Sequence, residues 1–205
     1  MSGFAYFLHL FHSGGLVMYP LLLLSLFTIA IAVERFFYYK ANRKGSKVFC
    51  KGIKSAVTHQ QWDAAVEYCG KYNTAMSRIV ASGLQHQDNE KDMKDAFQEQ
   101  MVVESVNFRR YLDYLSATVT ISPLLGLLGT VTGMIGTFSV LDSGAGASAI
   151  SGGIGEALIA TATGLCVAII AFVVYTYYDH QLDTIITDTE QLCVDVVNAH
   201  KAAAK

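Results

Sequence analysis

Charged residues are absent from three long stretches of this sequence. The uncharged runs are Leu16–Val33, Tyr114–Leu141 and Ala157–Tyr178. Each has at least the roughly 18–20 residues that a helix needs to cross the hydrocarbon core of a bilayer. We therefore predict an all-α integral membrane protein with three transmembrane helices. The second and third helices are expected to extend into the cytoplasm, which also holds several short helices.

Lysine and arginine are missing from residues 1–34 and 111–200, whereas residues 35–54 hold seven of the 15 in the chain. Because basic residues beside a span favour the cytoplasmic side, the segment after the first span is placed inside and the N-terminus outside. The predicted order is an outer amphipathic segment 1–15, a span 16–39, a cytoplasmic helical region 40–110, a span 111–141, an outer loop 142–151, a span 152–178 and a cytoplasmic helix 179–205.

A cleaved signal peptide is the alternative interpretation of the first run, since Ala30-Ile31-Ala32 resembles a cleavage site. A signal peptide, however, carries its basic residues before the apolar run, whereas here they follow it. We therefore favour a retained transmembrane helix.

Motifs of enzymes and metal sites are also lacking. The sequence has no P-loop, HExxH, GxSxG or nucleotide fingerprint, and its four cysteines form no CxxC pair. His9 and His12 have helical spacing but no third ligand nearby. We expect no enzyme activity, no cofactor, no metal site and no disulfide, and the net charge of −2 gives no indication of nucleic-acid binding.

Periodic apolar positions predict helices outside the three runs. Helices are expected at 46–57, 61–69 and 74–85, with Asn73 as the N-cap of the third and Asp88 or Asn89 as the N-cap of the next. From Glu90 the pattern continues without a break, which predicts one helix to about Leu141. The last helix should begin near Gly152 and continue past the membrane with an apolar stripe of Leu182, Ile185, Ile186, Leu192 and Val196.

Glycine is abundant in two of the uncharged regions. Residues 123–138 read PLLGLLGTVTGMIGTF and residues 151–165 read SGGIGEALIATATGL. Small residues at helical spacing let membrane helices approach closely. The predicted helix-packing residues are Gly126, Gly129, Gly133, Gly136, Gly153 and Gly164.

Glu156 is the costly residue of the third span. A carboxylate at the bilayer centre costs about 2.5–3.5 kcal/mol on insertion scales, and such residues usually face a bundle interior or a water-filled cavity. Helical spacing brings Thr161 to the flank of this face, and Thr130 and Thr137 are candidates for the same cavity. We predict that these four residues line a polar pathway. The alternative is that the threonines bond to their own helix carbonyls and that Glu156 lies at the interface as an N-terminal helix charge.

One chain makes too narrow a bundle to enclose a polar lumen, so a homo-oligomer is expected. A proton relay also needs more than one titratable group. Asp113 and Asp179 lie at the inner ends of the second and third spans, too far from Glu156 to share a site with it. We expect the missing acid to come from another protein.

The two glycine segments resemble the signature segments of the MotA/TolQ/ExbB proton channel family, and are most similar to its ExbB/TolQ branch. The resemblance extends to GGLVMYPLLLLS and VERFFYY around the first span and to QWDAAVEYCGKYN after it. It therefore covers all three spans.

The resemblance implies five copies around a pore lined by the second and third helices, in the bacterial inner membrane with a periplasmic N-terminus. The pore would enclose helices of an ExbD or TolR partner, whose membrane Asp is the protonated group. Thr130 in GTV and Thr161 in EALIAT match the pore threonines of the family, and Glu156 matches its membrane glutamate.

Three functions follow as hypotheses. The first is an ExbB-like proton channel that energises TonB-dependent transport across the outer membrane. The second is a TolQ-like subunit of the Tol–Pal system, with a role in envelope integrity and division. The third is a passive membrane scaffold whose glycine faces only assemble helices.

Overall fold

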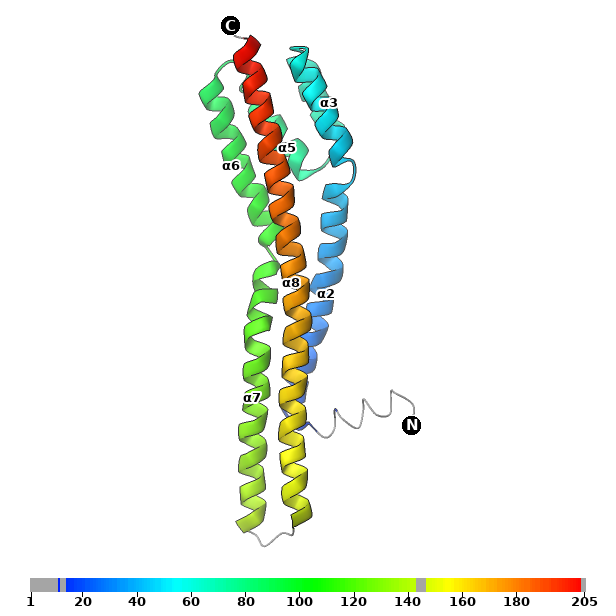
Figure 1. Cartoon of the computed structure of the whole chain (residues 1–205), viewed down its shortest axis with the longest axis vertical. Helices are drawn as coiled ribbons and strands as arrows, with labels where there is room; N and C mark the ends of the chain where they lie inside the picture. Colours follow the sequence, from blue (N-terminus) through cyan, green and yellow to red (C-terminus); the bar gives the residue numbers. More distant parts are fainter. Residues whose placement is uncertain (1–10, 12–13, 143–146, 204–205) are drawn as a thin grey trace. The chain divides into compact units, whose positions relative to one another are not determined.

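The computed structural model describes residue 11, residues 14–142 and residues 147–203. No β-strand occurs among these residues, and their regular structure is helical (Figure 1). The predicted outer segment, with His9 and His12, falls largely outside them. The helices are α2 (Met18–Arg43), α3 (Ser46–Thr58), α4 (Trp62–Gly70), α5 (Ala75–Leu84), α6 (Glu90–Arg109), α7 (Leu112–Asp142) and α8 (Ala147–Ala203).

The chain divides into two compact units. Unit 1 consists of residues 1–33 and 113–176, and unit 2 consists of residues 34–112 and 177–205. Because α2 and α8 are each unbroken helices, both contribute residues to both units.

Unit 1 contains α7 and the apolar parts of α2 and α8. All three helices are long and apolar enough to cross a membrane. Large apolar side chains point outward from each of them, with Leu23, Leu124 and Ile169 67%, 59% and 62% exposed. Such a surface suits contact with lipid, since soluble monomers rarely expose large apolar patches. The prediction of an all-α membrane protein with three transmembrane helices is confirmed.

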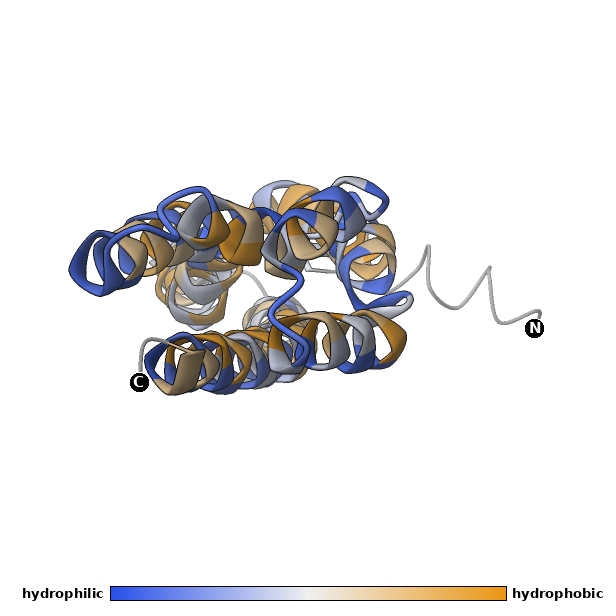
Figure 2. Cartoon of the chain, turned by 90° about the horizontal axis from the view of Figure 1, so that it is seen from above, coloured by the Kyte–Doolittle hydropathy of each residue, from blue (hydrophilic) through white to orange (hydrophobic). Residues whose placement is uncertain are grey.

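Unit 2 has an apolar core that lies between its helices. α3, α4, α5, α6 and the end of α8 each contribute buried side chains, and Figure 2 shows hydrophobic and hydrophilic residues on different faces of the same helices. Four residues of the predicted stripe on α8 are buried and Ile186 is half-buried. The short helices begin and end within one or two residues of the predicted positions. The core is formed by Phe49, Ile53, Val57, Ala65, Cys69, Met76, Ile79, Val80, Leu84, Met93, Phe97, Leu192, Cys193, Val196 and Val197.

The predicted single helix from Glu90 to Leu141 is wrong, because α6 ends at Arg109 and α7 begins at Leu112. The buried guanidinium of Arg35 on α2 explains the break. Its Nη1 donates to the backbone carbonyls of Asn107 at 3.2 Å and Phe108 at 3.1 Å. In a continuous helix these oxygens would accept from the N–H groups four residues later. Arg35 therefore stabilises the end of α6 by satisfying carbonyls that a helix terminus leaves without partners.

Two expectations at helix ends also need correction. Thr74, not Asn73, caps α5, because its Oγ1 accepts from the Ser77 N–H while the Ser77 Oγ accepts from the Thr74 N–H. This reciprocal pair is a capping box, and the Asn73 side chain instead accepts a hydrogen bond from Arg78. The expected N-cap at Asn89 is confirmed by its bond from the Lys91 N–H.

The predicted outer loop is also too long. α8 begins at Ala147, so residues 147–151 are helical. Alanine at 147 and 149 favours helix, and the glycines that follow do not interrupt it.

Candidate functional site

α7 and α8 approach each other through glycine within unit 1. A Cβ placed on Gly164 of α8 would lie 2.6 Å from the Ser122 carbonyl oxygen and 3.0 Å from the Gly126 Cα of α7. A Cβ on Gly126 would lie 3.0 Å from the Thr161 Cα. The two backbones are therefore in direct contact, and any larger side chain at these positions would force them apart.

The same pattern continues toward the loop between the two helices. Gly129 faces the Ala160 side chain, Gly133 lies against Ala157, and Gly153 leaves room for the Thr137 hydroxyl. Ala157 and Ala160 are buried by these contacts. The alternation of glycine with alanine or threonine explains how apolar helices with no charged residue between them find a specific register.

Gly136 differs from the other glycines that were predicted to pack. No atom of the described residues lies within 4 Å of the position that its Cβ would take. Its role in helix packing stays a prediction.

The three predicted threonines have different surroundings. The Thr161 Oγ1 donates across the helix pair to the Gly126 carbonyl at 2.9 Å. The buried Thr137 donates to the Gly133 carbonyl of its own helix at 2.8 Å. Half-buried Thr130 donates to the Leu127 carbonyl at 2.6 Å. Thr130 and Thr137 thus make the local bonds of the alternative interpretation, and Thr161 instead connects α8 to α7.

Glu156 is exposed on α8, one residue before the buried Ala157. Its Oε1 occupies the space where Gly15 would carry a Cβ, and Gly15 has a φ of +70°. Glycine suits this position for two reasons: it tolerates a positive φ, and it leaves room for the carboxylate. Sequence reasoning did not identify this contact, although a Gly-Gly pair directly before an apolar run was a signal for it.

The structure does not bring the four predicted pathway residues to one point. Glu156 contacts Gly15, Thr137 faces Gly153, and Thr161 bonds to Gly126. Glu156 and Thr161 are five residues apart, which is roughly 7.5 Å along a helix axis. These side chains lie along one helix pair, and the shared lumen stays a prediction that depends on further copies of the chain.

Ser122 is a polar residue of the α7–α8 contact that sequence reasoning missed. It is fully buried, and its Oγ has no hydrogen-bond partner among the residues that the structure describes. A buried hydroxyl left without a partner costs about 1–3 kcal/mol. Its position one turn before Gly126 extends the polar positions of α7 toward the beginning of that helix.

Metal chemistry has no evident location in the described part of the chain. No group of three or more His, Cys, Asp or Glu side chains is placed there to hold a metal ion.

Comparison with known proteins agrees with this architecture. The sequence profile of the MotA/TolQ/ExbB proton channel family matches residues 71–191. A biopolymer transport protein ExbB homolog of Methanothermobacter thermautotrophicus is 33% identical over 86% of this chain and 64% of its own length. A biopolymer transport protein ExbB-like 1 of Synechocystis is 35% identical over 80% of this chain and 67% of its own. The biopolymer transport protein exbB1 of Vibrio cholerae is 30% identical, over 76% and 71% of the two chains.

The profile match covers more than half of the chain, and the chain therefore belongs to the MotA/TolQ/ExbB proton channel family. It spans about two thirds of the length of the first two relatives. Membership agrees with the resemblance found in the glycine segments.

Proposed function

We propose that this member of the MotA/TolQ/ExbB family is an ExbB-like subunit of the bacterial inner membrane, with a periplasmic N-terminus and a cytoplasmic C-terminus. Together with an ExbD-like single-span protein it uses the proton motive force to energise TonB-dependent transport across the outer membrane. Support comes from relatives named as ExbB biopolymer transport proteins and from the uneven placement of basic residues around the spans.

The exposed carboxylate of Glu156 carries the proposal. It lies on a membrane-spanning helix, where a charge facing lipid is costly, yet it is exposed in the single chain. A lumen formed by several copies, in the family arrangement a pentamer, gives this side chain a polar environment. Thr130 and Thr161, which are half-buried, then supply oxygen atoms along the wall of the lumen, whereas Thr137 is buried against Gly153. The partner's membrane Asp supplies the second titratable group.

Proton flux through the purified complex tests the pathway. The chain and its partner are reconstituted into liposomes, and flux is followed with a pH-sensitive dye under an imposed gradient. Glu156→Gln is expected to reduce the flux at least tenfold while the complex still assembles. Thr161→Val is expected to reduce it less, because one oxygen is lost but the titratable group remains.

Thr163→Val is the matched control for Thr161→Val. Thr163 lies on the same helix and donates to the Ile159 carbonyl of its own turn, so its loss should leave the flux within twofold of wild type. Normal flux in Glu156→Gln would refute the pathway. A wild-type complex that conducts no protons at any pH would support a passive scaffold.

A TolQ-like role is the alternative, because the matching family includes TolQ by name. The phenotype of a deletion strain distinguishes it from the ExbB-like role. Loss of TonB-dependent uptake with an intact envelope supports the ExbB-like role. Detergent sensitivity and constriction defects with normal uptake would instead assign the chain to a Tol–Pal system.

A further inference from the structure

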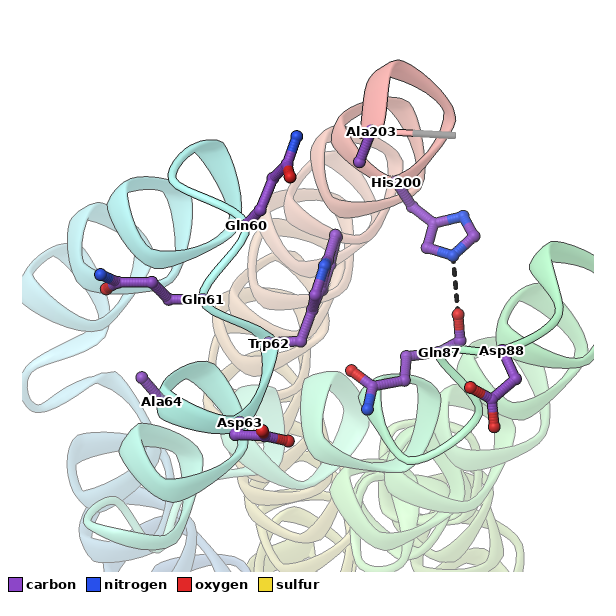
Figure 3. Close-up of a pocket in the computed structure, with 9 residues that line it drawn as sticks. All are labelled: Gln60, Gln61, Trp62, Asp63, Ala64, Gln87, Asp88, His200 and Ala203. Atoms are coloured by element: carbon purple, nitrogen blue, oxygen red, sulfur yellow. Dashed lines mark hydrogen bonds between the residues drawn. The ribbon is translucent and has the colours of Figure 1, made fainter. Parts of the chain in front are cut away.

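Unit 2 contains a cavity of about 520 Å³ that has no part in the proposed proton pathway. Trp62 and Asp63 come from the beginning of α4, Gln87 and Asp88 from the turn between α5 and α6, and His200 from the end of α8. Figure 3 shows the Trp62 ring and the Asp63 carboxylate on one side, and the Gln87 amide pointing toward them from the other. Its volume is within the roughly 300–1,000 Å³ typical of small-ligand sites.

The lining is rich in hydrogen-bond acceptors and has one sign of charge. Asp63 and Asp88 are the ionisable acids that border the cavity, and no Lys or Arg among the residues that the structure describes lines it. The Gln87 Oε1 is buried and has no hydrogen-bond partner in the described part of the chain. An unpaired buried acceptor of this kind is costly, and a ligand donor would satisfy it once the amide rotates to expose this oxygen to the cavity.

The cavity is formed before any ligand arrives. The His200 ring nitrogen Nε2 lies 2.7 Å from the Gln87 carbonyl oxygen, and because a carbonyl only accepts, Nε2 carries the proton. The same ring packs edge-on against Trp62 at 5.6 Å between centroids. One side chain of α8 thus holds both the indole and the Gln87 backbone in place.

We propose that this cavity binds the guanidinium group of an arginine in a peptide segment of a partner protein. A guanidinium is planar, presents five N–H donors and stacks on aromatic faces. Those properties match the Trp62 indole, the Asp63 carboxylate and the unpaired amide oxygen of Gln87. The Asp88 carboxylate also borders the cavity but is turned away from the indole (Figure 3). A lysine ammonium offers three donors and no plane, so it fits the lining less well. Free arginine carries a carboxylate that Asp63 and Asp88 repel, and this favours an arginine within a peptide.

This proposal concerns unit 2 alone and does not depend on proton conduction. A complex without proton flux would still bind the arginine segment, and a cavity that binds nothing would leave the proposed pathway intact.

Fluorescence provides a direct test, because Trp62 is the single tryptophan of the chain. The purified full chain in detergent is titrated with N-acetyl-arginine amide, N-acetyl-citrulline amide, N-acetyl-lysine amide and free L-arginine. The arginine amide is expected to change the Trp62 emission with saturation. Citrulline, a neutral analogue of similar shape, should give no saturable change, and the lysine amide and free arginine should bind at least tenfold more weakly.

Variants separate recognition from folding. Asp63→Asn should weaken binding of the arginine amide at least tenfold, and Asp63→Glu should restore much of it. Asp92→Asn is the matched control, since this exposed acid on α6 does not line the cavity, and it should change the affinity less than twofold. Unchanged helix content by circular dichroism shows that the variants fold. Equal binding of citrulline, or full affinity in Asp63→Asn, would overturn the proposal, and equal affinity for free arginine would overturn the assignment to a peptide.

Discussion

Replacing Arg35 should destabilise unit 2 more than replacing any other basic residue on α2. Its side chain is 3% exposed, and its Nη1 donates to two carbonyls at the end of α6. Its guanidinium also lies over the rings of Tyr38 and Tyr111, 4.6 and 4.7 Å from their centroids. Hydrogen bonds from a charged donor are worth about 1.5–3 kcal/mol each, and each cation–π contact adds about 0.5–2 kcal/mol.

These contributions do not all appear as lost stability in Arg35→Met. Methionine fills part of the volume, and removing the buried charge also removes its desolvation penalty. Glu34 is exposed enough that losing its partner matters little. We expect a net loss of about 3–4 kcal/mol, which for a chain of this size lowers the unfolding temperature by on the order of 10 °C. Arg35→Lys keeps the charge and one donor, so we expect about half of this loss.

Thermal unfolding of the detergent-purified protein, followed by circular dichroism, measures the effect. Arg43→Met is the matched control, because Arg43 is on the same helix and is exposed, and its guanidinium donates to the side chain of Gln181. It should shift the midpoint by less than about 2 °C, since exposed substitutions stay within about 0.5 kcal/mol. Equal midpoints for Arg35→Met and Arg43→Met would refute the reasoning. Hydrogen exchange at the end of α6 should be faster in Arg35→Met.

Three further predictions concern the helix pair and unit 2. Gly164→Ala should lower the unfolding midpoint by several degrees, because its Cβ would meet backbone at 2.6 Å and overpacking costs about 1–3 kcal/mol, whereas Gly155→Ala, with open space around it among the described residues, should not. The hydrogen bond from Arg78 lowers the pKa of Glu104 from its ordinary value of 4.5, so its stabilisation is present above about pH 4.5 and is lost as the pH falls through the lowered pKa. Glu104→Gln should therefore flatten the pH dependence of the midpoint there. Burial raises the pKa of the Cys193 thiol to about 12, so a thiol reagent at pH 8 should modify it only after unfolding, as mass spectrometry can show.

Local signals in the sequence predicted most of the helices but not the contacts that end them. The three uncharged runs and the apolar stripe on α8 gave correct helices, because burial in lipid or in a core requires apolar side chains at helical spacing. The break between α6 and α7 was missed because Arg35 reaches carbonyls that lie 72 and 73 residues further along the chain. Hydrophobic periodicity carries no information about such a bond.

In the candidate site, too, local spacing predicted some features, whereas contacts between distant segments were missed. Glycine spacing predicted which faces of α7 and α8 are small, and these faces do meet. The contact between the Glu156 carboxylate and Gly15 joins segments that are far apart in the sequence. The identity of neither residue predicts that the other is its partner. Asn73 and Thr74 illustrate the limit at short range, since both are good caps and only the side chain of Ser77 decides between them.

The hydrogen bonds of the threonines restrict how they can take part in the proposed pathway. A hydroxyl has one proton to donate, and Thr130, Thr137 and Thr161 each donate it to a backbone carbonyl. In this state their oxygens can accept from water or from a protonated carboxyl, but they cannot pass a proton onward. For Thr161 to relay a proton, its bond to the Gly126 carbonyl has to break, and that bond joins α8 to α7. Proton relay through Thr161 would therefore be coupled to a change in the contact between the two helices, whereas acceptance alone would leave that contact unchanged.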